Sequence, residues 1–374
     1  MRVGIPKETG AGETRVAVIP AGVTAMVKAG LQVAVEQGAG LAAGFPDASY
    51  TSQGATVASR ADVMRDADIL LQVRAIPPGN GLHAGQTLIG FADPLGAPQA
   101  VRDVASSGAA VLSMELMPRI TRAQSMDALS SMATIAGYKG VLLAANHLPR
   151  MFPMLMTAAG TVSPARVFIV GAGVAGLQAI SAARRLGAKV EAYDVRPAVK
   201  EQVQSLGARF VELPLESTDA EDKGGYAKAQ DESFYRRQRE MMLKVVAGSD
   251  VVITTALIPG KRAPILITTE MVEAMPPGSV IVDLAAERGG NTDLTQPDKA
   301  IDHNGVLILG PTNLAGEVAV NASSLYAKNL LAFLETMIDK KEKALKVNWD
   351  DEIVKGTLLA KDGRIVHPAL QGAQ

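Results

Sequence analysis

Short apolar runs alternate with amphipathic segments along most of the chain. Residues 3–6 and 31–36 each form an apolar run of strand length. Residues 20–29, between them, have the apolar spacing of a helix that Gly30 ends. Three more strands at 67–73, 87–90 and 109–113, and two helices near 61–65 and 99–106, continue this order. The alternation predicts a parallel sheet with helices on both faces.

The same alternation returns in the middle of the chain. Strands are expected at 167–170, 190–193, 208–213, 250–256, 279–284 and 306–309, with helices between most of them. A long helix from about Ala123 to residue 148 leads from the first region into the second. The pattern predicts an α/β fold of two Rossmann-like, doubly wound parallel-sheet domains with a cleft between them, joined by long helices.

The tail of the chain begins with an amphipathic helix at residues 321–338. Because no further sheet is predicted for this helix to cover, we expect it to return to the first domain. Lys361, Asp362 and Gly363 separate two apolar stretches and predict a hairpin. We therefore expect one domain formed by residues 1–132 and 315–374, and a second formed by residues 133–314.

The amino-acid composition limits the classes of protein to which this chain can belong. The 374 residues are 48% hydrophobic but only 4% aromatic, so aliphatic side chains must fill the cores, and the length favours two domains. A net charge of −1 without strong basic or acidic runs does not point to nucleic-acid binding. There is no Cys, which excludes disulfides and thiolate catalysis, and the four His lack metal-ligand spacing, so no metal site is expected. No apolar run of bilayer-spanning length is seen, and we expect a soluble, cytoplasmic protein.

One stretch combines the features of a dinucleotide-binding turn. Gly171, Gly173 and Gly176 follow the expected strand at G-x-G-x-x-G spacing and open an expected helix. The first glycine allows a tight turn, the second lets a pyrophosphate approach the backbone, and the third lets the helix pack closely on the strand. The helix N-terminus, at Val174, offers unpaired N–H groups to phosphates. The alternative is a strand-to-helix turn that binds nothing.

Asp194 ends the second expected strand of this region. A carboxylate at this position can accept hydrogen bonds from both ribose hydroxyls of NAD(H). It would also repel a 2′-phosphate. The sequence therefore predicts a preference for NAD(H) over NADP(H).

A polar, glycine-containing segment interrupts the alternation at residues 214–231. Long loops in compact domains are usually functional lids or disordered segments. Within residues 214–231, Tyr226 follows Gly224 and Gly225, so one aromatic side chain stands after two flexible residues, and the segment could be a lid. A solvated surface loop is the equally supported alternative.

A polar group lies where the connecting helix is expected. Gln124, Asp127 and Ser130 recur every third residue and would share one helical face, with Arg119 upstream. The group could line a nicotinamide in the cleft, although capping alone also favours an Asp and a Ser near a helix start. Oxidation of an alcohol or amine needs an acid or base beside the nicotinamide, whereas transfer between two nicotinamides needs apposed rings and excluded water. The absence of an obvious acid or base weakly favours the second reaction.

Several motifs together resemble one known family. They are IPKE…ETRVAVIP, MELMPRITRAQSMDALSS, MFPMLMTAAGT, GAGVAGLQAI, AYDVR, GGYAK, ITTALIPGK, VDLAAERGGN and YAKNLL. Over nearly its whole length the chain resembles the soluble NAD(H)-binding component (domain I or alpha-1 subunit) of proton-translocating NAD(P) transhydrogenase. The segment MPRITRAQSMDALSS is the most specific section of this resemblance.

The resemblance implies a role for each candidate site residue. Arg119, Gln124, Asp127 and Ser130 match the group around the nicotinamide and its ribose, and Gln124 would also reach toward the NADP(H) of a partner domain. Asp194 matches the acid that binds the adenosine ribose. The other cofactor-binding positions are Gly171, Gly173, Val174 and Gly176 in the pyrophosphate turn, Val195, Arg196, Ala256 and Leu257, and Tyr226 in a mobile loop at 214–231 that closes on the nucleotide.

The resemblance also implies partners. The family's component is a homodimer that docks on an NADP(H)-binding subunit and exchanges hydride with it, and a separate membrane-spanning subunit couples the transfer to proton movement. The chain would then be cytoplasmic and peripheral to the inner membrane through its partners. Two departures stand out: Met132 replaces an expected Gln, and residues 315–317 replace a PS-containing turn.

Alanine dehydrogenase is the alternative enzyme, because that family is similar to this chain at Arg15 and around VDLAAERGG. Its substrate-binding Lys would fall near Gln72 and its catalytic His near residues 91–93, and neither residue type is present there. Its catalytic Asp would fall near Glu287, where the match is ambiguous. A non-catalytic NAD-binding regulatory protein is a third alternative, which would bind nucleotide without exchanging hydride.

Overall fold

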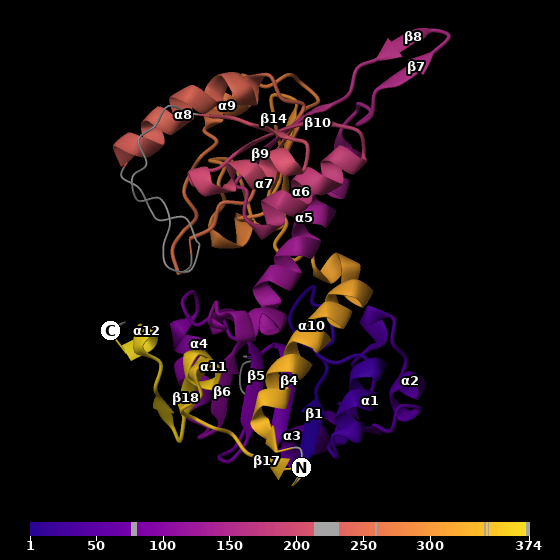
Figure 1. The fold of residues 1–374 in the computed structure, drawn as a ribbon, viewed down its shortest axis with the longest axis vertical. Coiled ribbons are helices and arrows are strands. Elements are labelled where there is room, and N and C mark those ends of the chain that lie inside the picture. The colour runs from indigo at the N-terminus through magenta and orange to yellow at the C-terminus, as the bar shows by residue number, and fades with distance from the viewer. Residues whose placement is uncertain (76–80, 213–231, 259, 340–341, 343, 372–374) are drawn as a thin grey trace. The chain divides into compact units, whose positions relative to one another are not determined.

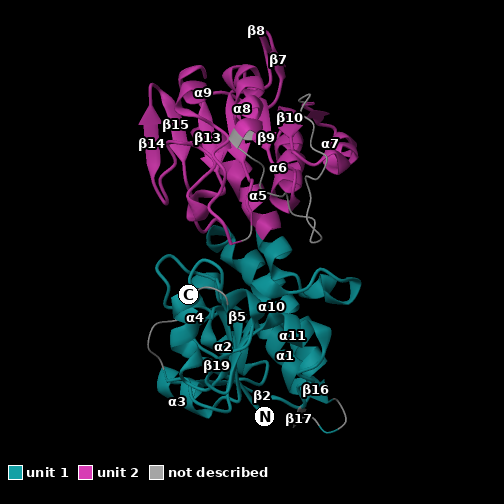
Figure 2. Cartoon of the chain, turned by 90° about the vertical axis from the view of Figure 1, so that its left-hand side faces the viewer, with its two compact units in different colours: residues 1–132, 315–374 teal, residues 133–314 magenta. Residues whose placement is uncertain are grey.

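The structure is a computed structural model and describes residues 1–75, 81–212, 232–258, 260–339, 342 and 344–371. The chain forms two compact units (Figure 2). Unit 1 consists of Met1–Met132 and Ala315–Gln374, and unit 2 consists of Ala133–Leu314.

Unit 1 is built on a sheet with the strand order β19-β18-β6-β5-β4-β1-β2-β3 (Figure 1). The strands from β3 to β6 run parallel, and β18 and β19 add an antiparallel hairpin beside β6. Their bounds are β1 Arg2–Ile5, β2 Gln32–Glu36, β3 Thr56–Ala58, β4 Ile69–Arg74, β5 Thr87–Phe91, β6 Ala110–Ser113, β18 Leu358–Lys361 and β19 Arg364–Ile365. The expected hairpin is confirmed, with positive φ at Asp362 and Gly363.

Helices pack around this sheet. The α-helices are α1 Pro20–Lys28, α2 Asp47–Thr51, α3 Arg60–Asp66, α4 Pro98–Ala105, α10 Ala319–Leu334, α11 Glu352–Thr357 and α12 Pro368–Gln371. Helix α1 begins at Pro20, which fits the first turn because no N–H is needed there, and ends before Gly30, whose φ is 86°. In α10, the buried Tyr326 hydroxyl donates to the Gln72 carbonyl oxygen of β4 at 2.8 Å, so the tail helix packs on the first sheet.

Short elements complete unit 1. A two-residue pair, β16 Ile338–Asp339 and β17 Ala344–Leu345, is antiparallel. The 3-10 helices are η1 Leu41–Ala43, η2 Met114–Leu116, η3 Thr121–Met126, η6 Gly316–Val318 and η7 Glu335–Met337. Sequence patterns did not resolve these elements. Residues 123–126 and 335–338 were expected to belong to longer helices, and the other elements are too short to show a period.

Unit 2 contains a sheet with the strand order β11-β10-β9-β12-β13-β15-β14. All neighbours are parallel except β14 and β15. The bounds are β9 Arg166–Val170, β10 Lys189–Tyr193, β11 Arg209–Phe210, β12 Val251–Thr254, β13 Val280–Asp283, β14 Ala300–His303 and β15 Val306–Leu309. The order reverses between β9 and β12, which defines the switch point of a doubly wound sheet. The predicted fold class is therefore confirmed.

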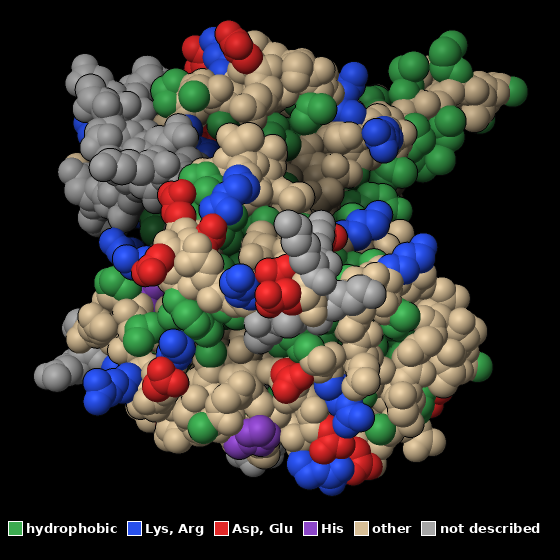
Figure 3. Space-filling model, turned by 60° about the horizontal axis from the view of Figure 1, so that its bottom comes forward, with side chains coloured by type: hydrophobic (Ala, Val, Ile, Leu, Met, Phe, Trp, Pro, Cys, Tyr) green, Lys and Arg blue, Asp and Glu red, His purple; other side chains and the backbone are tan. Residues whose placement is uncertain are grey.

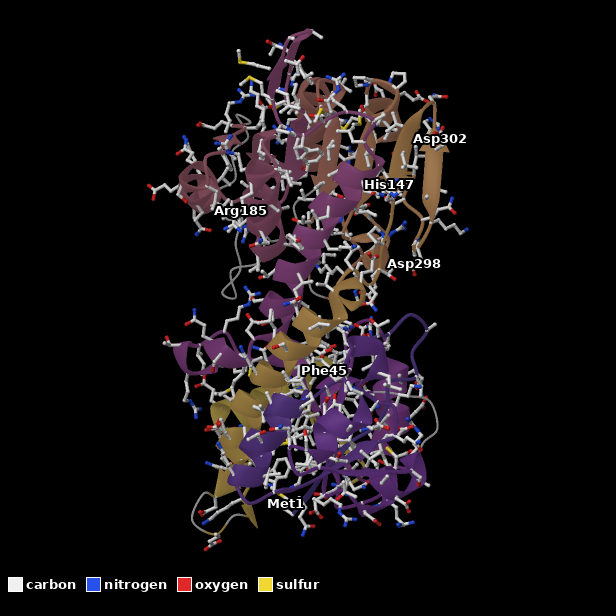
Figure 4. The ribbon with its side chains drawn as sticks, turned by 90° about the vertical axis from the view of Figure 1, so that its right-hand side faces the viewer. Met1, Phe45, His147, Arg185, Asp298 and Asp302 are labelled. Carbon is white, nitrogen blue, oxygen red and sulfur yellow. The ribbon has the colours of Figure 1, made fainter. Side chains whose placement is uncertain are left out.

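The helices of unit 2 are α5 Ala128–His147 (whose first residues belong to unit 1), α6 Val174–Arg185, α7 Lys200–Ser205, α8 Glu232–Ala247 and α9 Thr269–Glu273, with the 3-10 helices η4 Pro197–Val199 and η5 Ala286–Arg288. Figure 4 shows His147 and Arg185, the last residues of α5 and α6. The fully buried Val141 of α5 and Ile180 of α6 join the same apolar cluster as Ile169 of β9. Both helices therefore cover the sheet through apolar faces.

Two hairpins of unit 2 were not predicted. In the first, Asn304 and Gly305, whose φ values are 54° and 81°, form the turn between the antiparallel strands β14 and β15. An Asn-Gly pair is a known hairpin signal, but the apolar pattern predicted only the second of these strands. β7 Leu155–Thr157 and β8 Gly160–Val162 form an exposed hairpin that extends from unit 2 (Figure 1). Because every residue of both strands is exposed, the hairpin has no buried face that would impose an alternation of apolar and polar residues. The strand expected at 208–213 is also shorter, because β11 ends at Phe210.

The connecting helix starts later than expected. The 3-10 helix η3 ends at Met126, and α5 begins at Ala128 after Asp127, whose φ is −73° and ψ is 87°. A single helix from Ala123 is therefore wrong. By length and composition alone, α5 could cross a bilayer, contrary to the expectation that no such segment exists. Core helices of soluble proteins can have the same length and composition.

Candidate functional site

The three motif glycines occupy different positions after β9. Gly171 has φ of 97°, and a Cβ there would lie 2.6 Å from Thr255 Oγ1. A Cβ on Gly176 would lie 1.9 Å from the Gly171 carbonyl oxygen. At Gly173, the nearest heavy atom to a Cβ is Arg196 Nη2, at 4.0 Å. The fold thus requires glycine at the first and third positions and leaves room at the second.

The same turn opens α6 at the switch point of the sheet. Gly173 is the N-cap, and the helical hydrogen bonds begin with the Leu177 N–H, which donates to the Gly173 carbonyl oxygen at 2.8 Å. The N–H groups of Val174 and Ala175 lie in the first turn, where helix geometry provides no carbonyl acceptor. Val174 is 42% exposed. The carboxyl ends of β9 and β12 and the helix N-terminus therefore meet where an anion would be stabilised.

Asp194 lies directly after β10, and its side chain is only 5% exposed. Oδ2 accepts the Ala172 N–H at 2.7 Å, which ties the acid to the glycine turn. Arg196 donates its backbone N–H and Nε–H to Oδ1, both at 2.9 Å, and its Nη2–H to Oδ2 at 2.8 Å. The acid predicted to bind ribose thus lies beside the glycine turn and is paired with Arg196.

The loop after β12 carries Ala256 and Leu257, and a buried amide positions it. Asn291 Oδ1 accepts the Ala256 N–H at 3.0 Å, and Nδ2 donates to the Ala256 carbonyl oxygen at 2.9 Å. Nδ2 also donates to the Pro264 carbonyl oxygen at 2.8 Å. Leu257 remains 41% exposed. One side chain therefore holds both ends of this loop.

Asn291 is itself held by the fully buried Asp283 at the end of β13. Asp283 Oδ2 accepts the Asn291 N–H at 2.7 Å and the Thr295 hydroxyl at 2.6 Å. Sequence reasoning missed Asn291, although the segment VDLAAERGGN contains it. Two glycines with positive φ, Gly289 at 92° and Gly290 at 79°, mark the tight turn before it and were the available signal.

The four residues predicted around the nicotinamide lie in unit 1. Asp127 Oδ1 accepts the Ser130 N–H at 2.9 Å, and Oδ2 accepts the Ser130 hydroxyl at 2.6 Å. Gln124 and Arg119 are exposed. Because Gln124 belongs to η3 and Ser130 to α5, the single helical face inferred from their spacing is wrong. Asp127 and Ser130 together cap α5.

The remaining predicted positions divide into two groups. Val195 and Ala256 are partly buried and pack against the apolar cluster that contains Tyr193 and Met242. Tyr226 and the loop at 214–231 lie outside the described residues.

In the portion of the chain that is described, no group of three or more His, Asp and Glu could hold a metal ion.

A second polar cluster lies inside unit 1. Arg15 donates from Nε to Glu13 Oε1 at 2.7 Å and from Nη2 to Oε2 at 2.6 Å, and both side chains are buried. Glu8 accepts the N–H groups of Val73 at 2.7 Å and Arg74 at 3.1 Å. Burial raises the pKa of Glu8 to about 7, although these hydrogen bonds oppose the shift. Burial would also raise the pKa of Glu13, but its bonds to Arg15 lower it.

The positions compared with alanine dehydrogenase are Arg15, Gln72 and residues 91–93 in unit 1 and Glu287 in unit 2. Gln72 is 1% exposed, and its Oε1 has no hydrogen-bond partner among the described residues. The Asp93 N–H donates to Glu115 Oε1 at 2.7 Å. Glu287, in unit 2, is exposed within η5. The described partner of the Arg15 side chain is the carboxylate of Glu13, and Gln72 and Asp93 are neither a Lys nor a His.

The switch point, the glycine turn and the acid after the second strand define the chain as an α/β protein with a Rossmann-type fold. Two family models match it: Alanine dehydrogenase/PNT, N-terminal domain, over residues 4–136, and Alanine dehydrogenase/PNT, C-terminal domain, over residues 140–368. The chain belongs to the alanine dehydrogenase/PNT family.

Individual relatives refine this assignment. The chain is 49% identical over 381 residues to the first part of NAD(P) transhydrogenase subunit alpha from Rhodospirillum rubrum, covering 100% of this chain and 99% of that protein. A transhydrogenase structure from Sinorhizobium meliloti matches with a TM-score of 0.88 and 47% identity, covering 98% of this chain and 100% of that one. An L-alanine dehydrogenase structure matches with a TM-score of 0.83 and 27% identity, covering 99% and 98%. The resemblance inferred from the motifs is confirmed, and both kinds of relative are oxidoreductases.

Proposed function

We propose that the chain is the NAD(H)-binding component of an NAD(P) transhydrogenase. It takes part in direct hydride transfer between NADH and NADP⁺ held on a separate NADP(H)-binding subunit. The observation that carries this proposal is the turn between β9 and α6, where Gly173 leaves room beside a helix N-terminus and Asp194 follows β10. The higher identity to transhydrogenases, 49% against 27% for the alanine dehydrogenase structure, supports the choice of reaction.

Unit 2 residues would hold the nucleotide. Backbone N–H groups at Gly173 and Val174 bind the pyrophosphate, and Asp194 accepts hydrogen bonds from the adenosine ribose. The Asn291-held loop presents Ala256 and Leu257 to the same site. Gly171, Gly176 and Val195 complete the proposed set of residues around the nucleotide, and Arg196 lies beside them, paired with Asp194. Tyr226 is the remaining proposed position and lies outside the described residues.

Unit 1 residues would orient the nicotinamide and its ribose. NAD(H) supplies the hydride when bound. Asp127 orients the Ser130 hydroxyl through their 2.6 Å hydrogen bond, and the exposed Gln124 amide reaches toward the partner's NADP(H). Arg119 adds a positive charge to this group. Because hydride passes between two nicotinamides, no side chain has to accept or donate a proton.

The structure of unit 1 gives less support to alanine dehydrogenase. Arg15, which that family shares, has its Nε and Nη2 bonded to the buried Glu13. Gln72 and Asp93 supply neither the Lys nor the His that such an enzyme would need. The polar cluster is instead arranged to satisfy its own charges.

The partners and location belong to the proposal as well. The chain acts as a homodimer in the cytoplasm and lies peripheral to the inner membrane, where a membrane-spanning subunit couples hydride transfer to proton translocation. The exposed hairpin β7–β8 supports self-association, since hydrophobic side chains gather on it (Figure 3). Met154, just before β7, is 56% exposed, and Leu155, Met156 and Val162 are 38%, 78% and 38% exposed. Exposed apolar patches of this kind usually mark interaction sites.

Self-association can be tested through this hairpin. Met156→Asp should convert the dimer to monomers in sedimentation equilibrium, because a charge at the interface is costly to desolvate. Val320→Asp, at another exposed apolar position in α10, is the matched control and should remain dimeric. A monomeric wild-type chain would contradict the homodimer.

Isotope transfer tests the reaction. The chain is mixed with NADH carrying deuterium at the transferred C4 position and with the NADP⁺-loaded partner subunit. Direct transfer places the deuterium in NADPH, which mass spectrometry detects. Loss of label to water, NADH oxidation that requires pyruvate and ammonium, or binding without any exchange would each contradict the proposal, the last two in favour of the alternatives.

Gln124→Asn tests the proposed nicotinamide group. We expect slower hydride transfer with nearly unchanged NADH affinity, because the proposal assigns Gln124 to the nicotinamide and not to the adenosine half of the nucleotide. Gln37→Asn, at an exposed position after β2, is the control. Equal losses of NADH affinity and of the hydride-transfer rate would contradict the nicotinamide role assigned to Gln124.

A further inference from the structure

Arg196 occupies most of the acceptor capacity of Asp194. An ionised carboxylate offers about four lone-pair positions. The Ala172 N–H uses one, and the Arg196 N–H, Nε–H and Nη2–H use three more, all at 2.7 to 2.9 Å. Ribose hydroxyls can therefore bind this acid only if the guanidinium of Arg196 withdraws.

The guanidinium also lies on the open side of the glycine turn. Arg196 Nη2 is the nearest heavy atom to the Cβ position of Gly173, at 4.0 Å. The Arg196 side chain is only 13% exposed. The group therefore lies between the acid and the turn, where the ribose and its phosphates would lie.

We propose that Arg196 is a specificity-determining residue, which competes with the ribose for Asp194. The ion pair as a whole, rather than the acid alone, sets the preference for NAD(H) over NADP(H). This inference rests on the proposed function, because it takes the turn after β9 as the NAD(H) site.

The chemistry of the two groups explains the preference. A guanidinium is well suited to bind a phosphate through two parallel hydrogen bonds. In this chain two guanidinium nitrogens of Arg196 already donate to Asp194, which neutralises the cation. A 2′-phosphate would therefore gain little from Arg196 and would be repelled by the Asp194 carboxylate. Without the carboxylate, a buried guanidinium would lack its charge partner, and a phosphate could replace it.

Binding of NADH and NADPH to four chains tests the inference: wild type, Asp194→Asn, Arg196→Gln and the double variant. Nucleotide fluorescence gives the dissociation constants, and circular dichroism verifies folding. In Asp194→Asn we expect NADPH affinity to rise about tenfold and NADH affinity to fall about tenfold, with the NADPH gain shrinking as salt is added. In the double variant the NADPH gain should disappear.

Arg196→Gln alone gives an independent measurement if the Asp194 variants fail to fold. Removal of the competitor should raise NADH affinity about threefold. A fall in NADH affinity would show that the guanidinium binds NADH directly and would overturn the inference. An NADPH gain that persists in the double variant, or that is absent from a folded Asp194→Asn chain, would also overturn it. If wild type binds no NADH, the proposed function fails; if it binds NADH and these variants behave otherwise, only the inference fails.

Discussion

Asn291 holds Ala256 through two hydrogen bonds, one to its N–H at 3.0 Å and one from the amide to its carbonyl oxygen at 2.9 Å. With the bond to Pro264, three contacts depend on a fully buried side chain. Asn291→Ala should lower the free energy of unfolding by about 3 kcal/mol, because each lost bond leaves a backbone group unsatisfied. It should also weaken NADH binding, since the loop that carries Leu257 is released.

Thermal unfolding and NADH titration measure both effects. Asn321→Ala, which alters an exposed residue of α10, is the control and should change neither. Normal stability in Asn291→Ala would show that the loop does not depend on this amide.

Two glycines of the turn are expected to have different roles: Gly176 is needed for folding and Gly173 for nucleotide binding. Gly176→Ala places a methyl group 1.9 Å from the Gly171 carbonyl oxygen, and we expect a loss of about 3 kcal/mol in stability. Gly173→Ala meets only Arg196 Nη2 at 4.0 Å, so the fold should be retained while NADH affinity falls about tenfold. Circular dichroism melts and fluorescence titrations distinguish them. Unchanged NADH binding in Gly173→Ala would argue against a pyrophosphate at this turn.

Asp127 can be tested as a cap and as a site residue. Asp127→Ala should cost about 1 kcal/mol of stability, because α5 loses the acceptor for the Ser130 N–H. Asp127→Ser should restore most of that stability, since serine is also a good N-cap. If Asp127 also orients the nicotinamide ribose, hydride transfer to the NADP⁺-loaded partner stays slow in Asp127→Ser. Wild-type transfer rates in this variant would reduce Asp127 to a cap.

The buried Glu8 predicts a pH-dependent stability. Its pKa is about 7 in the folded chain against 4.5 as the ordinary value, so the folded state holds the extra proton between these values. The stabilisation is complete below pH 4.5 and is lost as the pH rises through 7. Relative to wild type, Glu8→Gln should therefore gain about 3 kcal/mol in unfolding free energy between pH 4.5 and 8.

Urea unfolding at several pH values measures this difference. Glu342→Gln, at an exposed position, is the control. A difference between wild type and Glu8→Gln that stays constant with pH would assign the proton to another group, such as Glu115, whose pKa burial also raises.

Sequence patterns were most informative where a period is long or a backbone requirement is strict. The parallel strands of both sheets other than β3, the return of the tail helix and the turn at Gly171 followed from such patterns. Patterns failed at β7–β8 and at β14, which lack alternation over enough residues. They also merged η3 with α5, because helical spacing cannot show that Asp127 caps rather than continues a helix.

The sequence by itself determined the fold class, the family and the position of the glycine turn, because hydrophobic periods and glycine spacing act locally along the chain. Only the tertiary structure decided which polar groups pair. Asp194 with Arg196 and Asp127 with Ser130 are close in sequence, but their geometry depends on where β10 ends and α5 begins. Asn291 reaches Ala256 across 35 residues. Such contacts depend on buried strand ends meeting in space, and local residue patterns do not encode them.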